Sequence, residues 1–163
     1  DRVSDLLHES SSIALLEGDE ILYVARSSTT RRIMSVDLGI GTRLPAYCTS
    51  MGRVLLAHLP PAGLDAYFAR VKLIAHTNRT VIAPEKLRKE LAAVARNDFA
   101  VVDQELELGL RSIAVPVRDL AGKVVAAMNI GTQASRVSLA ELERRFLPEL
   151  RLAARELGSM LLA

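Results

Sequence analysis

The sequence predicts an α+β fold in which helices surround an antiparallel sheet of about five or six strands. Short apolar stretches bounded by turn residues predict the strands, and these stretches group over residues 12–44 and 99–132. Stretches with apolar residues at helical spacing stand before, between and after the two groups. The chain has 163 residues, half of them hydrophobic and a quarter charged, which is typical of one domain with one core.

The first group of strands follows a short helix over residues 1–8. A hairpin is predicted over residues 12–28, because Gly18 interrupts two apolar runs at the position of a turn. A further strand is predicted over residues 32–44, where glycines near its end permit unusual backbone angles.

Two helices are predicted next. Thr49 or Ser50 can cap a helix that continues to residue 59. Pro61 suits the first turn of a second helix over residues 61–71.

The second half is predicted to hold a helix, three strands and a final helix. Pro84 opens the helix over residues 84–98, whose apolar stripe is formed by Leu87, Leu91, Val94 and Ala95. The strands are predicted over residues 99–107, 110–117 and 124–132. Ser138 and Glu141 form a capping box that opens the last helix. Its apolar face is predicted to hold Leu142, Phe146, Leu150, Ala154, Leu157 and Leu161.

The last two predicted strands have one small-residue face. With a turn at Asp119 to Gly122, Ser112 lies opposite Asn129, and residues directly opposed point to the same face. That face carries Ser112, Ala114, Ala127, Asn129 and Gly131, and the other carries Ile113, Val115, Val117, Val124, Met128 and Ile130. Small residues with convergent polar groups indicate a shallow ligand cavity. Close helix packing, with Ser112 and Asn129 bonded to each other, is the alternative.

Composition limits the classes of function. The net charge of +2 gives no nucleic-acid footprint, and no apolar run approaches the roughly 18 residues that span a bilayer. One cysteine cannot form an internal disulfide, which fits a cytoplasmic protein. The sequence has no cysteine pair and no His-x3-His spacing, so it predicts no metal site. Because the chain opens at Asp1 directly in a predicted helix, we expect a piece of a longer protein.

The segment "LPAYCTSMGR" holds the one cysteine, Cys48. A nucleophilic cysteine needs a base and an orienting group, and His8, His58 and His76 stand in no recognisable catalytic spacing. We therefore interpret Cys48 as a small buried hydrophobe.

Charged residues offer two further interpretations. Three acidic residues would share one face of a strand: Asp103, Glu105 and Glu107. The simpler interpretation is a solvated rim or strand end, and the alternative is that one of them accepts a hydrogen bond from a donor at the mouth of the cavity. The basic cluster "RSSTTRRI" and Arg43 could bind carboxylates, although a solvated surface is the simpler interpretation.

Two segments in this order, "GIGTRLPAYCTSMGRVLLAHLP" and "VVDQELELGLRSIAVPVRDLAGKVVAAMNIGT", resemble the effector-binding domain of the IclR-type transcriptional regulators. The second segment is most similar to the branch of the PcaR, PcaU and PobR kind, which controls aromatic-acid catabolism through the β-ketoadipate pathway. The resemblance implies a GAF-like or profilin-like fold, with a curved antiparallel sheet and a small-molecule cavity on its concave side.

The resemblance also implies a domain organisation and partners. Residues 1–8 would be the remnant of the interdomain linker helix, and residues 9–163 the effector-binding domain. The N-terminal winged helix-turn-helix domain, the only part that would contact DNA, is absent from this sequence. A cytoplasmic homodimer or homotetramer is expected, with no membrane partner, no catalytic residue, no metal and no cofactor. The implied effector is a small carboxylate: protocatechuate, 4-hydroxybenzoate or β-ketoadipate.

Candidate effector-binding residues are carried over from the family position by position. The ligand loop corresponds to Leu44, Pro45, Ala46, Ser50, Met51 and Gly52. The backbone amides around Ala46 and from Ser50 to Gly52 are expected to meet a carboxylate. The family's Glu-x6-Cys element becomes Glu105 and Ser112, with Asp103 nearby, and its polar positions on the next strand become Asn129 and Gly131. Ile113 is expected to support the walls, and Arg43 to neutralise a second charge.

Two other classes of function stay open. One is a GAF-like enzyme that uses Cys48 as a redox or nucleophilic thiol, which needs an exposed thiol with a low pKa. The other is a purely structural oligomerisation domain with a filled core.

Overall fold

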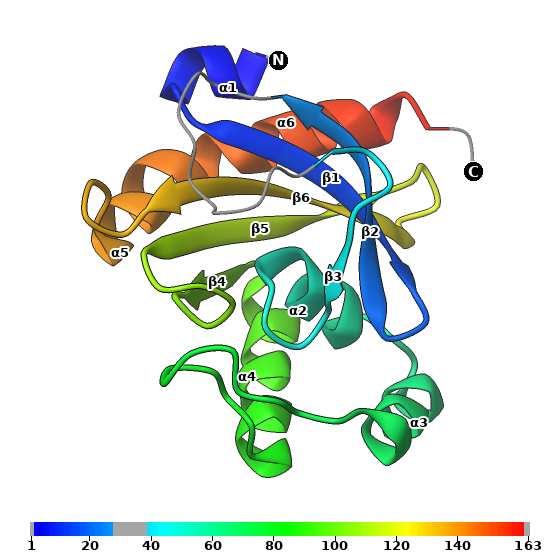
Figure 1. Ribbon diagram of the computed structural model, residues 1–163. Coiled ribbons are helices and arrows are strands. Elements are labelled where there is room, and N and C mark those ends of the chain that lie inside the picture. Colours follow the sequence, from blue (N-terminus) through cyan, green and yellow to red (C-terminus); the bar gives the residue numbers. More distant parts are fainter. Residues whose placement is uncertain (1, 28–38, 162–163) are drawn as a thin grey trace.

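The fold is an α+β arrangement built on one curved, six-stranded antiparallel sheet, as predicted. The computed structural model describes residues 2–27 and 39–161. The strand order is β3-β2-β1-β6-β5-β4, and helices cover both faces of the sheet (Figure 1). None of the helices in the described ranges is long and apolar enough to cross a membrane.

The N-terminal elements are α1 (Arg2–Leu7), β1 (Ser10–Glu17), β2 (Glu20–Ser27) and β3 (Arg43–Pro45). The predicted hairpin is confirmed, with Gly18 in the left-handed region at its turn. Of the strand expected over residues 32–44, residues 32–38 lie outside the described residues. Only Arg43–Pro45 forms a strand in the remainder.

The helices that follow are α2 (Ser50–Ala57), α3 (Pro61–Arg70) and α4 (Pro84–Asn97). Thr49 caps α2, since its hydroxyl accepts a hydrogen bond from the amide of Gly52 at 3.2 Å. Leu87, Leu91 and Val94 of α4 are buried as predicted. Ala95 is exposed, so its place in the stripe is wrong.

The C-terminal elements are β4 (Ala100–Asp103), β5 (Leu110–Arg118), β6 (Val124–Gln133), α5 (Leu139–Glu141), η1 (Leu142–Phe146) and α6 (Leu147–Ser159). Ser138 caps the last helical region by accepting from the amide of Glu141 at 3.1 Å. The π-helical turn η1 directly precedes α6, whose second residue is Pro148. Because proline lacks an N–H, the regular α-helical ladder cannot continue unchanged through it.

The register predicted for β5 and β6 is wrong by two residues. Ser112 lies opposite Gly131, and Asn129 lies opposite Ala114. The pairing is displaced by two residues for two reasons. The turn is one residue longer than predicted and includes Lys123, and a bulge at Val125 adds one more unpaired residue to β6.

Two extra residues restore the alternation of side chains, because a strand has a period of two. The predicted small-residue face is therefore observed on the side of α2. Val124 is the exception, since it precedes the bulge and packs on the α2 side instead of the opposite face.

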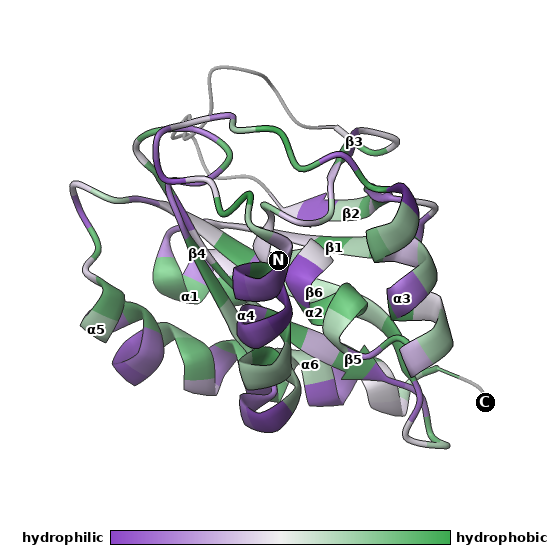
Figure 2. Cartoon of the chain, turned by 90° about the horizontal axis from the view of Figure 1, so that it is seen from below, coloured by the Kyte–Doolittle hydropathy of each residue, from purple (hydrophilic) through white to green (hydrophobic). Residues whose placement is uncertain are grey.

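The sheet separates two hydrophobic layers. On one face, Ala114 and Ala127 pack with the buried residues of α2, α3 and α4. On the other, Ile113, Val115 and Ile130 pack with α1, η1 and α6. Hydrophilic and hydrophobic residues alternate along α4 and α6, as expected for helices with one buried side (Figure 2).

Gly52 allows α2 to lie against the chain that leads into it. A Cβ atom at this position would overlap the backbone of Ala46 and the hydroxyl of Thr49. The obstacle is backbone, which cannot rotate away as the end of a side chain can. The contact therefore requires glycine and fixes the start of α2.

We expect Gly52→Ala to lower the free energy of unfolding by about 1–3 kcal/mol, the usual cost of overpacking. Gly63→Ala is the matched control, because its nearest contact would be at 3.8 Å and alanine favours a helix. Urea unfolding of both variants checks the prediction. Equal stability of the two variants would contradict it.

Candidate functional site

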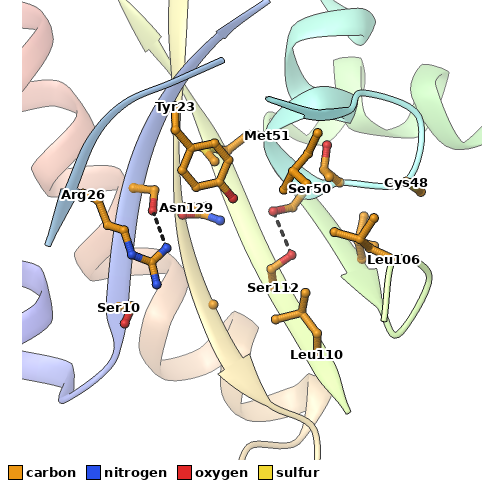
Figure 3. Close-up of a pocket in the computed structure, with 15 residues that line it drawn as sticks. Ser10, Tyr23, Arg26, Cys48, Ser50, Met51, Leu106, Leu110, Ser112 and Asn129 are labelled. Atoms are coloured by element: carbon orange, nitrogen blue, oxygen red, sulfur yellow. Dashed lines mark hydrogen bonds between the residues drawn. The ribbon is translucent and has the colours of Figure 1, made fainter. Parts of the chain in front are cut away.

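A cavity lies between the beginning of α2 and the small-residue face of the sheet (Figure 3). Its apolar lining is formed by Leu44, Cys48, Met51, Val102, Leu106 and Leu110. Its polar lining is formed by Ser10, Ser12, Tyr23, Arg26, Thr49, Ser50, Ser112 and Asn129, and Gly131 completes the wall. Apolar walls with a few convergent polar groups are characteristic of small-molecule sites.

Aligned positions of neighbouring strands form the floor of the cavity. Asn129 is paired with Ser12 on one side and Ala114 on the other. In the next row, Gly131 lies between Ser10 and Ser112. Small side chains in both rows leave space above the sheet.

Tyr23 and Arg26 reach the same cavity because β2 is bulged. They are three residues apart, so a regular strand would point them to opposite faces. An extra residue, Val24, stands between the pairs Ala14–Tyr23 and Ile13–Ala25 and brings both side chains to the cavity.

The side chains of Tyr23 and Arg26 bring a phenol and a positive charge to the wall. Arg26 donates a hydrogen bond to the hydroxyl of Ser12 at 3.4 Å. Burial raises the pKa of Tyr23 to about 12, although the charge of Arg26 opposes the shift. The phenol is therefore neutral at physiological pH and can both donate and accept a hydrogen bond.

The first turn of α2 presents backbone amides at the cavity wall. Gly52 donates to the Thr49 hydroxyl, but no described residue accepts from the amides of Ser50 or Met51. Free amides and the positive end of the helix dipole together favour an anion. The hydroxyl of Ser50 is held in place by that of Ser112, which donates to it at 2.9 Å.

Asn129 is the polar side chain that most needs a further partner. It is 9% exposed, and its Oδ1 is buried without a hydrogen bond. Ser112 bonds to Ser50, so the Ser112–Asn129 bond of the packing alternative is not formed. A buried polar group without a partner costs about 1–3 kcal/mol, and a ligand in the cavity would remove this cost.

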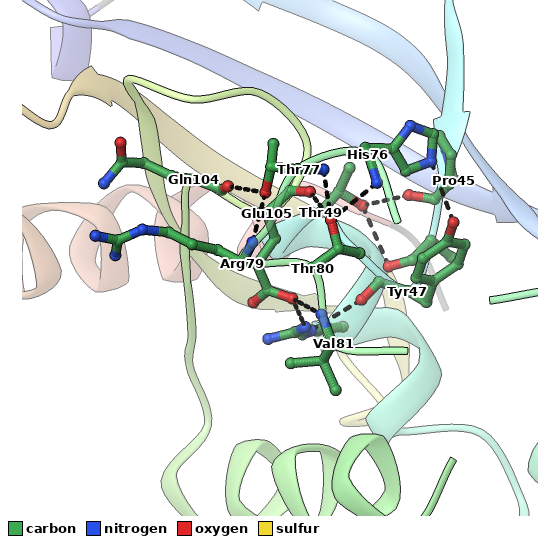
Figure 4. Close-up of polar contacts among 12 residues, drawn as sticks. Pro45, Tyr47, Thr49, His76, Thr77, Arg79, Thr80, Val81, Gln104 and Glu105 are labelled. Carbon is green, nitrogen blue, oxygen red and sulfur yellow. Dashed lines mark hydrogen bonds and ion pairs between the residues drawn. The ribbon is translucent and has the colours of Figure 1, made fainter. Parts of the chain in front are cut away.

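A buried ion pair holds the first turn of α2 in place (Figure 4). Arg53 donates to the carboxylate of Glu105 at 2.6 Å and to the carbonyl of Tyr47 at 2.9 Å. The same carboxylate accepts from the amide of Val81 at 2.9 Å, and Thr80 donates to the carbonyl of Glu105 at 2.6 Å. The network therefore joins α2, the segment before α4 and the turn after β4.

The interpretation of Asp103, Glu105 and Glu107 as three residues on one strand face is wrong. The strand ends at Asp103, and Gln104 has a φ of 60° that breaks the alternation. Glu105 is buried in the ion pair instead of lying on a solvated rim.

Six of the candidate effector-binding residues come together around the cavity: Leu44, Ser50, Met51, Ser112, Asn129 and Gly131. Pro45, Ala46 and Gly52 do not line it but shape the approach to α2, where the Thr49 hydroxyl donates to the Pro45 carbonyl at 2.9 Å.

Three other candidates lie away from the cavity. Ile113 is on the opposite face of the sheet, since it is adjacent to Ser112 in a strand. Asp103 accepts from Arg111 at 2.9 Å and from Arg79 at 3.2 Å. Arg43 pairs with Glu17 at 2.7 Å on the exposed surface.

The sequence reasoning missed several cavity residues, of which Arg26 and Tyr23 carry the most chemistry. Arg26 belongs to the basic cluster that was noted, but the bulge that turns it inward leaves no clear signal in the sequence. Ser10 and Ser12 could have been found by pairing β1 with β6, because both face polar or glycine positions there.

Cys48 has none of the properties of a reactive thiol. Its side chain is fully buried, and burial raises the pKa of the thiol to about 12, so the thiolate is not populated at neutral pH. In residues 2–27 and 39–161 no cluster of His, Cys, Asp and Glu could hold a metal ion.

We expect Glu105→Gln to lower the free energy of unfolding by about 3–5 kcal/mol, because it leaves the buried Arg53 charge uncompensated. The matched control is Glu17→Gln, which breaks the exposed pair with Arg43. We expect a much smaller loss there, because water screens an exposed pair. Urea unfolding measures both. A loss at Glu105 as small as that at Glu17 would show that the buried network does not anchor α2.

Comparison with known proteins places the chain in a family. Residues 1–159 match the family described as bacterial transcriptional regulator IclR C-terminal. The Pca regulon regulatory protein of Pseudomonas putida is 55% identical over 96% of this chain and 54% of its own length. The p-hydroxybenzoate hydroxylase transcriptional activator of Acinetobacter baylyi is 35% identical over 91% of this chain and 56% of its own length. The chain thus spans about half the length of these curated relatives.

A solved structure agrees with both the fold and the family. It is a double mutant of the PobR inducer-binding domain from Acinetobacter in complex with 3-hydroxybenzoic acid. It has a TM-score of 0.90 and 32% identity, and the match covers 98% of this chain and 93% of that one. The chain therefore belongs to the C-terminal domain family of the bacterial IclR transcriptional regulators.

Proposed function

We propose that this chain is the effector-sensing domain of a transcriptional regulator of aromatic-acid catabolism. The names of its relatives from Pseudomonas and Acinetobacter support this class of regulator. In the proposal, residues 1–8 belong to the linker helix and residues 9–163 bind the effector. A preceding winged helix-turn-helix domain contacts DNA, and the whole protein is a cytoplasmic homodimer or homotetramer.

The single observation that carries the proposal is the Asn129 amide, which is buried in the cavity without a partner for its oxygen. Its neighbours are a cation and four serine hydroxyls, while the remaining walls are largely apolar. A small acid with an apolar body and a second polar group complements this set of walls.

The carboxylate of the effector binds the amides of Ser50 and Met51 at the beginning of α2. Asn129 and Ser112 bind its hydroxyl or keto group, while Leu44 and Gly131 line the body of the ligand. Arg26 takes the part first given to Arg43, because Arg26 lines the cavity and Arg43 is paired with Glu17 on the surface.

Binding requires the cavity to open. Its volume is about 40 Å³, so it holds only about three waters. Leu106 is the part of the wall best placed to move. It belongs to a turn between two residues with left-handed backbone, Gln104 and Gly109, and is only partly buried.

Calorimetric titration with protocatechuate, 4-hydroxybenzoate and β-ketoadipate tests the proposal. We expect at least one acid to bind and Ser112→Leu to abolish its binding by filling the cavity. Arg26→Gln should weaken binding by about 10- to 100-fold, most for the dianionic β-ketoadipate, since a hydrogen bond to a charged group contributes about 1.5–3 kcal/mol.

Arg43→Gln is the matched control for the titration and should leave the affinity unchanged. If it weakened binding while Arg26→Gln did not, the assignment of Arg26 would be wrong. If none of the three acids bound, the proposed effector class would be wrong.

The thiol-enzyme alternative makes an opposite prediction for Cys48. Because this side chain is fully buried with a raised thiol pKa, we expect no alkylation by iodoacetamide at pH 8 in the folded chain. Complete alkylation should follow in denaturant. Rapid labelling of the folded chain, detected by mass spectrometry, would restore the enzyme alternative.

A further inference from the structure

The ladder between β1 and β2 faces the cavity on one side and α1 on the other. Ser12 pairs with Arg26, and both line the cavity. The next pair along the ladder is Ser11 and Ser27, whose positions alternate to the opposite face. Adjacent pairs of one ladder therefore contact the candidate effector site and the N-terminal helix.

A single buried hydroxyl joins α1 to both strands at this pair. Ser4 is 4% exposed, and its hydroxyl donates to the carbonyl of Ser27 at 3.2 Å. It also lies 3.2 Å from the hydroxyl of Ser11, within hydrogen-bond distance. Ser4 is thus the side chain of α1 that contacts β1 and β2 together through polar atoms.

The same two cavity residues also border the space beneath α1. A second hollow is lined by Arg2 and Val3 of α1 and by Ser12 and Arg26 of the two strands. Arg26 therefore stands between the cavity and the underside of α1. A ligand that draws its guanidinium away breaks its hydrogen bond to Ser12, a residue that borders both spaces.

We propose that Ser4 is a positioning residue that couples the occupancy of the cavity to the position of α1. The proposal rests on the proposed function, in which a ligand anion attracts Arg26 away from Ser12. Backbone hydrogen bonds prevent adjacent pairs of the ladder from shifting independently. The shift at Ser12 and Arg26 therefore reaches Ser11 and Ser27, and through Ser4 it reaches α1.

A spin label on α1 tests the coupling without any ligand. Leu6→Cys offers an exposed attachment site, at 54% exposure, while the native Cys48 is buried and stays unlabelled. With Ser4 present, Ser12→Ala should raise the mobile fraction of the label about fivefold, which is the factor by which losing one net hydrogen bond changes an equilibrium constant. In the Ser4→Ala background, Ser12→Ala should add no further change.

Two control variants separate coupling from general loosening. Ser112→Ala makes the same change on the other wall of the cavity and should leave the label unchanged. Val3→Ala weakens the apolar packing of α1 but keeps the hydroxyl of Ser4, so the effect of Ser12→Ala should persist in it. The coupling is overturned if Ser12→Ala acts equally with and without Ser4, or has no effect, or if Val3→Ala removes the effect as Ser4→Ala does.

A ligand arm distinguishes failure of the coupling from failure of the proposed function. Saturating protocatechuate, 4-hydroxybenzoate and β-ketoadipate are added in turn to the labelled chain. A ligand that shifts the label only when Ser4 is present supports the coupling. If no acid binds while the dependence on Ser4 and Ser12 holds, the effector class is wrong and the coupling stands. If an acid binds and the label does not respond, the coupling is wrong and the effector class stands.

Discussion

The buried ion pair between Arg53 and Glu105 is the interaction on which the arrangement of the cavity depends. Both side chains are almost completely buried, so neither charge can turn to water when the other is displaced. Hydrogen bonds to Tyr47 and Val81 occupy further donors and acceptors of the pair and fix its geometry. The beginning of α2, the segment before α4 and the turn after β4 are consequently held to one another. These are the segments that bring Ser50, Met51 and Leu106 to the cavity.

Bulges determine which side chains face the cavity. The bulge at Val24 brings Tyr23 and Arg26 to the same side of β2, and the bulge at Val125 corrects the alternation of β6 after an extra turn residue. Each bulge changes one position in the chain and reverses the face of every residue on one side of it. The chemistry of the site is therefore set by two backbone irregularities as much as by the residues themselves.

The sequence predicted most of the elements and part of the site, and the reasons differ from one feature to another. Local signals predicted the Gly18 hairpin, the cap at Ser138 and the first-turn positions of Pro61 and Pro84. They also predicted a cap at Thr49 or Ser50, and the structure has it at Thr49. The small-residue face was also predicted, because an error of two residues in register keeps the period of a strand.

Features that depend on contacts between distant segments could not be predicted. The position of a bulge depends on which residue of the partner strand is matched, so Arg26 was not distinguished from the other arginines of its cluster. Glu105 has the sequence pattern of a solvated carboxylate, and only the approach of α2 shows that it is buried with Arg53. That the candidate residues of the cavity bind an acid stays a prediction.

The cavity holds unsatisfied groups that a fully packed core would not contain. The buried Asn129 oxygen lowers the stability of the empty state relative to a state in which it is hydrogen-bonded. The amides of Ser50 and Met51 have no acceptor among the described residues and can also receive a ligand. A ligand that bonds to these groups removes the penalty and adds its own burial. The buried ion pair holds the beginning of α2 and the turn after β4 together, so it keeps these groups at the wall of the cavity, where a ligand can bond to them. The ion pair does not line the cavity itself, and it contributes to affinity by positioning the first turn of α2 for the ligand.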